Sequence, residues 1–244
     1  MKTKIPNLSI KRFLTNSKVD QLFYLLILSD LVFILLHCLV RLGIFERYYK
    51  ILSLNIDQSM PEAFQYVKEL WIVLLLIITY IKRKEAVYLI WTLLFTFFLI
   101  DDFAGIHENL GGIISKGTSF IPAMDFISKD LGEFLGVAII GIIFLGVFLI
   151  AFFKSKRKGR RASVTLGFLV SALLFFGIAV DLIHAAFRGS SMVVYEFLAL
   201  VEDGGEMLVM TLILWFAINM KHFNKSLYSK GYQPLPRLFP KLEL

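Results

Sequence analysis

The 244-residue sequence contains a single cysteine, Cys38, and only 18% charged residues. One cysteine excludes a disulfide framework within the chain, a cysteine-based zinc site and an iron–sulfur cluster. The sequence also has 57% hydrophobic residues and a mean hydropathy of +0.73. Soluble domains are less apolar and carry about 25% charged residues. The composition therefore predicts a membrane protein and excludes disordered, collagen-like and coiled-coil chains.

Long apolar stretches account for most of the sequence. A helix needs about 20 mostly apolar residues to cross the hydrocarbon core of a membrane. Six stretches meet this requirement, at roughly 21–43, 66–82, 86–108, 132–153, 163–187 and 193–220. We therefore predict an all-α fold, a polytopic bundle of six transmembrane helices. It forms one transmembrane domain over 21–220, between a cytoplasmic basic N-terminus (1–20) and a cytoplasmic basic tail (221–244).

The basic residues are concentrated on one side of this predicted bundle. The N-terminus, the connections 82–84 and 154–161, and the tail hold 19 of the 26 lysines and arginines. The positive-inside rule places these segments, and both termini, in the cytoplasm. The net charge of +7 then reflects orientation, so we expect membrane lipids and no nucleic acid as partners. The opposite connections, 44–65 and 109–131, are expected to lie partly at the lipid interface as short amphipathic pieces.

Acidic residues lie where a membrane protein seldom places them. Charged side chains within a span cost about 2.5–3.5 kcal/mol each and are functional candidates by default. Eleven of the 19 acids fall inside or at the ends of the predicted spans: Asp30, Glu69, Asp101, Asp102, Glu108, Glu133, Asp181, Glu196, Glu202, Asp203 and Glu206. The nearest basic residues, Arg41, Lys68 and Arg188, are predicted near the outer ends of the spans. No lysine or arginine is therefore expected deep in a span, and Glu69 beside Lys68 is expected to be an ordinary interface charge.

Depth and helical spacing predict that most of these acids converge. With 1.5 Å of rise per residue, Asp101, Asp181 and Glu202 lie roughly 9–14 Å below the outer ends of their helices. Asp181 and His184, at positions i and i+3, share a face. The four acids of the last span lie within an arc of about 120°. Convergence of the motif DDFAGIHE (101–108) requires a bend, which Gly105 would permit, and Gly204-Gly205 would permit close approach of a neighbour.

Carboxylates combined with one or two imidazoles favour a divalent metal, Fe, Mn or Zn. Asp181-x-x-His184 is a version of the Glu-x-x-His pair that di-metal carboxylate bundles use. The predicted metal ligands are Asp101, Glu108, Asp181, His184, Glu202 and Glu206. Supporting or alternative ligands are Asp102, His107, Glu133, Asp203 and Glu196. No catalytic residue is assigned.

Three functions are compatible with such a site. A metal there would activate water or oxygen on a lipid-like substrate, which describes a membrane hydrolase or oxidoreductase. A cation or proton transporter or channel would use the same acids as its pathway. Its route through the cytoplasmic half could use only Asp30, Thr79, Thr92, Thr96 and Ser171. The third possibility is a structural or partner-binding membrane subunit.

Two motifs, DDFAGIHE and VEDGGEMLVM, resemble those of a group of bacterial polytopic inner-membrane proteins of unassigned function. The pattern of this group is an acidic pair followed by Ile-His-Glu, and later Glu-Glu/Asp-x-x-Glu-Met. The matching residues are Asp101, Asp102, His107, Glu108, Glu202, Asp203 and Glu206. The resemblance extends over about 50–215 and implies a multi-pass protein of the bacterial cytoplasmic membrane. With the topology above, the site would face the extracytoplasmic side.

Overall fold

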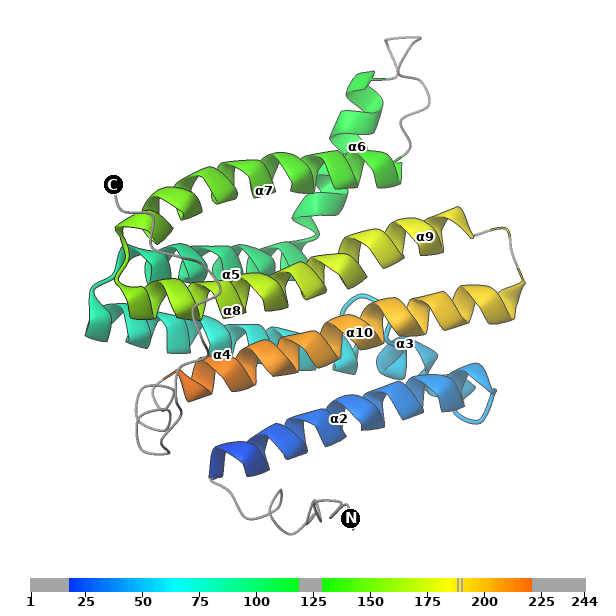
Figure 1. Cartoon of the computed structure of the whole chain (residues 1–244). Coiled ribbons are helices and arrows are strands. Elements are labelled where there is room, and N and C mark those ends of the chain that lie inside the picture. Colours follow the sequence, from blue (N-terminus) through cyan, green and yellow to red (C-terminus); the bar gives the residue numbers. More distant parts are fainter. Residues whose placement is uncertain (1–17, 119–128, 188, 190, 221–244) are drawn as a thin grey trace, which may run out of the picture.

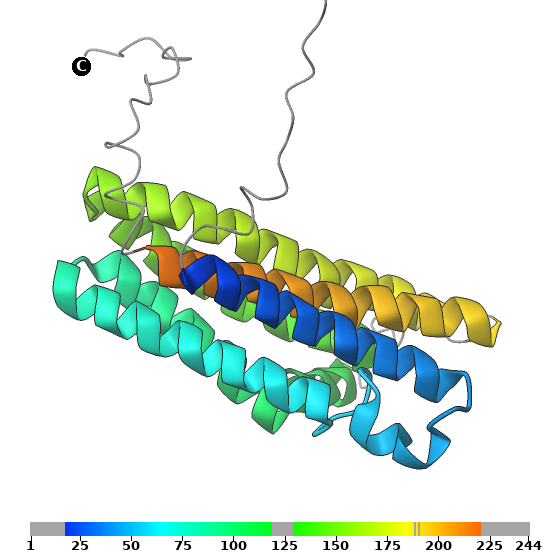
Figure 2. The same cartoon turned by 90° about the horizontal axis from the view of Figure 1, so that it is seen from below.

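The computed structural model describes residues 18–118, 129–187, 189 and 191–220, and these form a helical bundle without strands (Figures 1 and 2). The all-α prediction is confirmed. The elements are α2 (Lys18–Arg41), η1 (Glu46–Tyr48), α3 (Tyr49–Leu52), α4 (Met60–Arg83), α5 (Ala86–Ala104), α6 (Ile106–Thr118), α7 (Lys129–Lys154), α8 (Arg157–Leu174), η3 (Phe175–Val180), α9 (Asp181–Ala186) and α10 (Met192–Asn219). The predicted basic tail, and the N-terminus up to residue 17, lie outside the described residues.

Five of the described helices are long and apolar enough to cross a membrane, which indicates a membrane protein. They are α2, α4, α5, α7 and the continuous helix that α8, η3 and α9 form together. The sixth predicted span corresponds to α10, which has 28 residues. It is not among these five, because Glu196, Glu202, Asp203 and Glu206 interrupt its apolar sequence.

Local chemistry makes α4 begin six residues before the predicted span. Ser59 caps the helix by accepting a hydrogen bond from the backbone N–H of Glu62 at 3.4 Å. The Glu62 carboxylate in turn accepts the backbone N–H of Gln58, and Pro61 occupies the first turn, where its missing N–H is not needed. This pattern is close to a capping box. The helix therefore extends the second span toward the end of the bundle that carries α3.

Gly105 divides the third predicted span into two helices. Its backbone adopts the left-handed conformation, with φ of 58°, and ends α5 at Ala104. α6 then leaves the axis of α5 and packs against α7 (Figure 1). The expected bend at Gly105 is confirmed. The continuous helix predicted to residue 108 is wrong, because a left-handed residue ends one helix and the next begins directly after it.

α10 is the central helix of the bundle, and it contacts α2, α4, α8, η3 and α9. An apolar core fills the end of the bundle where α4 connects to α5 and α7 connects to α8. Ile72, Leu76, Phe95, Leu166 and Ile213 are fully buried there. This is the end that carries the basic connections. The polar part of the interior therefore lies toward the opposite end.

A buried ion pair joins α2, α4 and α10. The Nζ atom of Lys68 lies 3.1 Å from Asp30 Oδ1 and donates to the carbonyl oxygen of Met207 at 2.9 Å. It also donates to the hydroxyl of Thr211, and that hydroxyl donates to Asp30 at 2.6 Å. Lys68 and Asp30 are both 0% exposed. The expectation that no lysine lies deep in a span is wrong, because the early start of α4 places Lys68 more than two turns inside the helix.

Candidate functional site

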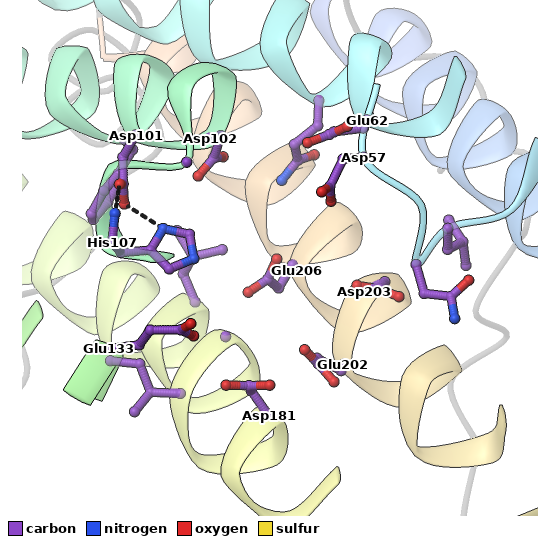
Figure 3. A pocket seen from close by; sticks show the side chains of 18 of the residues that line it. Asp57, Glu62, Asp101, Asp102, His107, Glu133, Asp181, Glu202, Asp203 and Glu206 are labelled. Atoms are coloured by element: carbon purple, nitrogen blue, oxygen red, sulfur yellow. Dashed lines mark hydrogen bonds and ion pairs between the residues drawn. The ribbon is translucent and has the colours of Figure 1, made fainter. Parts of the chain in front are cut away.

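A cavity of about 990 Å³ opens at the end of the bundle opposite the basic connections. Ten carboxylic side chains and two histidines line it: Asp57, Glu62, Glu69, Asp101, Asp102, Glu133, Asp181, Glu202, Asp203 and Glu206, with His107 and His184. Among the described residues, the lining contains no lysine or arginine. Figure 3 shows Glu206 between Asp102 on one side and Asp181 on the other. The cavity is therefore a strongly acidic site without a cationic side chain in its walls.

Three donors on α9 and α10 form one wall of the cavity. His184 is 9% exposed, and its Nδ1 atom lies 2.7 Å from Glu202 Oε2. The carboxyl groups of Glu202 and Asp181 are within hydrogen-bonding distance of each other. The His184 ring also packs against that of Tyr195, with 4.2 Å between the centroids. The predicted pairing of Asp181 and His184 on one face thus brings both to Glu202.

The turn of π-helix at η3 precedes Asp181 and packs closely on α10. Turns of this kind often lie at functional sites. A Cβ atom at Gly177 would collide with the carboxyl group of Glu206, and one at Gly205 would collide with the ring of Phe176. The expected close approach at Gly204-Gly205 is confirmed. The two glycines therefore leave room for Glu206 and for the packing of η3 on α10.

Asp101 connects α5 to α6. Its Oδ1 atom accepts the backbone N–H of His107 at 2.7 Å, and its Oδ2 atom lies 3.1 Å from His107 Nδ1 (Figure 3). The carboxylate therefore caps the first turn of α6, where backbone N–H groups lack partners within the helix. Asp101 is 6% exposed. Both of its oxygens contact His107, so this predicted ligand also holds the turn around Gly105 together.

The wall formed by α4 and α5 contains Glu69 and Asp102. Their carboxyl groups are within hydrogen-bonding distance of each other. Glu69 is fully buried, whereas Asp102 is exposed to the cavity. The hydroxyl of Tyr66 donates to the carbonyl oxygen of Asp102 at 3.1 Å, which ties α4 to the end of α5. The expectation that Glu69 is an interface charge is wrong, because α4 starts early and turns this residue inward.

The structure brings nine of the eleven predicted ligands to the cavity: Asp101, Asp102, His107, Glu133, Asp181, His184, Glu202, Asp203 and Glu206. The side chain of Glu108 lies outside the described residues. Glu196 is absent from the lining of the cavity and bonds instead to Arg41, with 2.6 Å between Oε2 and Nε. The arc of acids predicted on the last span is therefore divided between the cavity and an ion pair with α2.

Sequence reasoning missed Asp57, Glu62 and Gln65, which also line the cavity. All three belong to the segment that was predicted to lie at the lipid interface. The sequence Ser59-Met-Pro-Glu62 is a helix start signal. A helix predicted to begin at this signal has Glu62, Gln65 and Glu69 on one face, because they are spaced three and four residues apart.

The acidic and histidine side chains form separate small groups around the cavity and do not meet at one point. Among the described residues, no group of three or more Asp, Glu, His and Cys side chains is arranged to hold a metal ion. Asp101 contacts His107, Glu69 contacts Asp102, and Glu202 contacts both Asp181 and His184. The last three residues, Asp181, His184 and Glu202, form a trio on α9 and α10. A metal ion bound by this trio would replace the hydrogen bonds within it.

The fold and the site define a class: an all-helical protein with five described helices long and apolar enough to cross a membrane, and with an acidic cavity at one end of the bundle. The chain belongs to the family described as Domain of unknown function (DUF8692), whose family model matches residues 59–221. The match starts at the cap of α4 and includes every residue of the cavity lining from Pro61 onward. No curated protein and no solved structure matches the chain.

Proposed function

We propose that the protein is a multi-pass protein of the bacterial cytoplasmic membrane and that α10 is its sixth span. We further propose that its acidic cavity binds a divalent metal ion at Asp181, His184 and Glu202. The observation that carries this proposal is the lining of the cavity, in which ten carboxylic side chains meet no lysine or arginine of the described chain. Carboxylates enclosed in this way need protons or cations to balance them. An imidazole beside two carboxylates favours Fe, Mn or Zn.

The position of the cavity supports an extracytoplasmic opening. The connections at 84–85 and 155–156, where basic residues cluster, lie at the other end of the bundle. Under the positive-inside rule that end faces the cytoplasm. The cavity would then be open to the outer side and to substrates in the outer half of the bilayer.

The chemistry that such an ion supplies is the activation of water or oxygen, and a lipid-like substrate suits a cavity within the membrane. Asp203 lines the cavity, and its buried Oδ2 atom has no hydrogen-bond partner among the described residues. It would serve as a general base that takes a proton from the attacking group. Asp181, His184 and Glu202 would hold the ion.

The interior between the cavity and the basic end supports a one-sided site over a transport pathway. The hydroxyl groups of Thr79, Thr92, Thr96 and Ser171 each donate to the carbonyl oxygen four residues earlier in their own helix. Asp30 is bonded to Lys68 and Thr211. The residues that a route through this half would use are therefore satisfied locally.

Metal analysis of the purified full-length protein tests the proposal. We expect wild type to retain Fe, Mn or Zn in stoichiometric amount, and Asp181→Ala/Glu202→Ala to lose it. The matched control is Asp20→Ala/Glu46→Ala, which removes two acids outside the cavity lining and should keep the metal. If wild type holds no more metal than the Asp181→Ala/Glu202→Ala variant, the proposal fails. A cation flux in proteoliposomes that disappears with Glu206→Gln would establish transport instead.

A further inference from the structure

The α4–α5 wall of the cavity contains a second group of donors that differs in chemistry from the trio on α9 and α10. Gln65 and Glu69 are one helical turn apart on α4, and Asp102 is on α5 next to them. All three line the cavity. Their donor atoms are two carboxylates and an amide oxygen, without an imidazole.

Gln65 indicates that this wall accommodates a ligand. Its side chain is 8% exposed, and its Oε1 atom is buried without a hydrogen-bond partner among the described residues. A buried acceptor left without a donor costs about 1–3 kcal/mol. A cation bound from the cavity would satisfy this oxygen, whereas a second carboxylate or carbonyl would not.

Glu69 gives independent support. It is 0% exposed, and no donor group of the described chain reaches either of its carboxylate oxygens. Its neighbour Lys68 directs its Nζ atom to Asp30, Met207 and Thr211 instead. An ammonium group has three donors, so these three contacts of Lys68 use all of them.

Glu69 therefore faces another acceptor, the carboxyl group of Asp102. Two ionised carboxylates in contact need a shared proton or a cation between them. Asp102 is exposed to the cavity, so an ion that enters with its water reaches Asp102 first and Glu69 behind it.

We propose that Gln65, Glu69 and Asp102 form a second, all-oxygen cation site that takes a hard divalent cation of the Mg²⁺ type. Mg²⁺ and Mn²⁺ favour carboxylate and carbonyl oxygens and keep several water molecules. Three protein oxygens at the edge of an open cavity fit this preference. The site is separate from the histidine-containing site of the proposed function and does not depend on it.

The test uses Mn²⁺ as the probe, with the full chain in lipid nanodiscs stripped of metal by a chelator. We expect wild type to bind two Mn²⁺ ions in an equilibrium titration followed by electron paramagnetic resonance. Glu69→Gln and Gln65→Leu should each weaken one of them by about tenfold or more. Glu46→Gln, which removes an exposed acid outside the cavity lining, is the control and should change neither affinity by more than about threefold.

The nature of the ligands separates the two sites. In the variant Asp181→Asn/His184→Ala/Glu202→Gln, the remaining Mn²⁺ should show no histidine nitrogen modulation in pulsed spectra, and millimolar Mg²⁺ should displace it. The proposal is overturned if this variant binds no Mn²⁺, which would leave the histidine site as the single one. It is also overturned if Glu69→Gln retains both ions with unchanged affinity. Where Glu69→Gln fails to fold, Asp102→Asn replaces it with the same expectation.

Discussion

At the scale of single residues, the charged side chains are of two kinds: those that form ion pairs between helices and those that line the cavity. Lys68 and Asp30 neutralise each other out of contact with water. Arg41 neutralises Glu196 at the end of α2, where both side chains are partly exposed. The ten carboxylic side chains of the cavity have no such basic partner in its lining, as far as the chain is described. The basic residues of the interior thus hold helices together and leave the cavity acidic.

Removing one partner of the buried pair should expose this structural role. Lys68→Met leaves Asp30 buried without its cation, and breaking a buried pair in this way costs about 3–5 kcal/mol. The double variant Asp30→Leu/Lys68→Met removes both charges and should recover most of that stability. Unfolding followed by circular dichroism in detergent measures both. Lys50→Met, at an exposed position, is the control and should change stability by less than about 0.5 kcal/mol. A Lys68→Met variant as stable as this control would contradict the structural role.

At the scale of elements, η3 and α10 pack closely because each has a glycine, Gly177 or Gly205, at the point of contact. The ring of Phe176 occupies the place of a side chain at Gly205, and the carboxyl group of Glu206 does the same at Gly177. The positions of Asp181 and His184, which directly follow η3, depend on this packing. Small residues that let helices approach closely are typical of helix contacts in membranes.

A methyl group at this contact should therefore be costly. Gly205→Ala is expected to destabilise the protein by about 1–3 kcal/mol through overpacking. The control is Gly167→Ala in α8, where an added Cβ meets nothing within 4 Å. That change should be neutral or stabilise by up to about 1 kcal/mol, because alanine favours a helix more than glycine does. Thermal unfolding of the two variants makes the comparison, and equal midpoints would refute the tight contact.

Helix positions could largely be predicted from the sequence, because apolar runs and positive charges determine them locally. The bend at Gly105 could be predicted on another ground, because the acids of DDFAGIHE converge only if the helix bends and glycine permits a bend. The start of α4 was missed because hydropathy marks where a helix becomes apolar, whereas a capping residue such as Ser59 marks where it begins. The pairing of Asp30 with Lys68 joins residues 38 positions apart, and no local spacing predicts which helix supplies the partner.

At the scale of the whole molecule, polarity runs along the axis of the bundle. The acidic cavity and the connections with α3 and α6 lie at one end, and the apolar core and the basic connections lie at the other. An asymmetry of this kind gives the protein a direction in the membrane, since basic connections are retained in the cytoplasm. The direction decides which compartment supplies the cavity with its cations.

Cysteine labelling in intact bacterial cells measures this direction. Lys50 lies beside the cavity end and Lys156 lies at the basic end, and both are exposed. In a Cys38→Ser background, which removes the one native thiol, a membrane-impermeant maleimide should label Lys50→Cys in intact cells. Lys156→Cys should react only after the membrane is permeabilised. The reverse pattern would place the cavity on the cytoplasmic side, where the cation that fills it would come from the cell interior and the positive-inside assignment would be wrong.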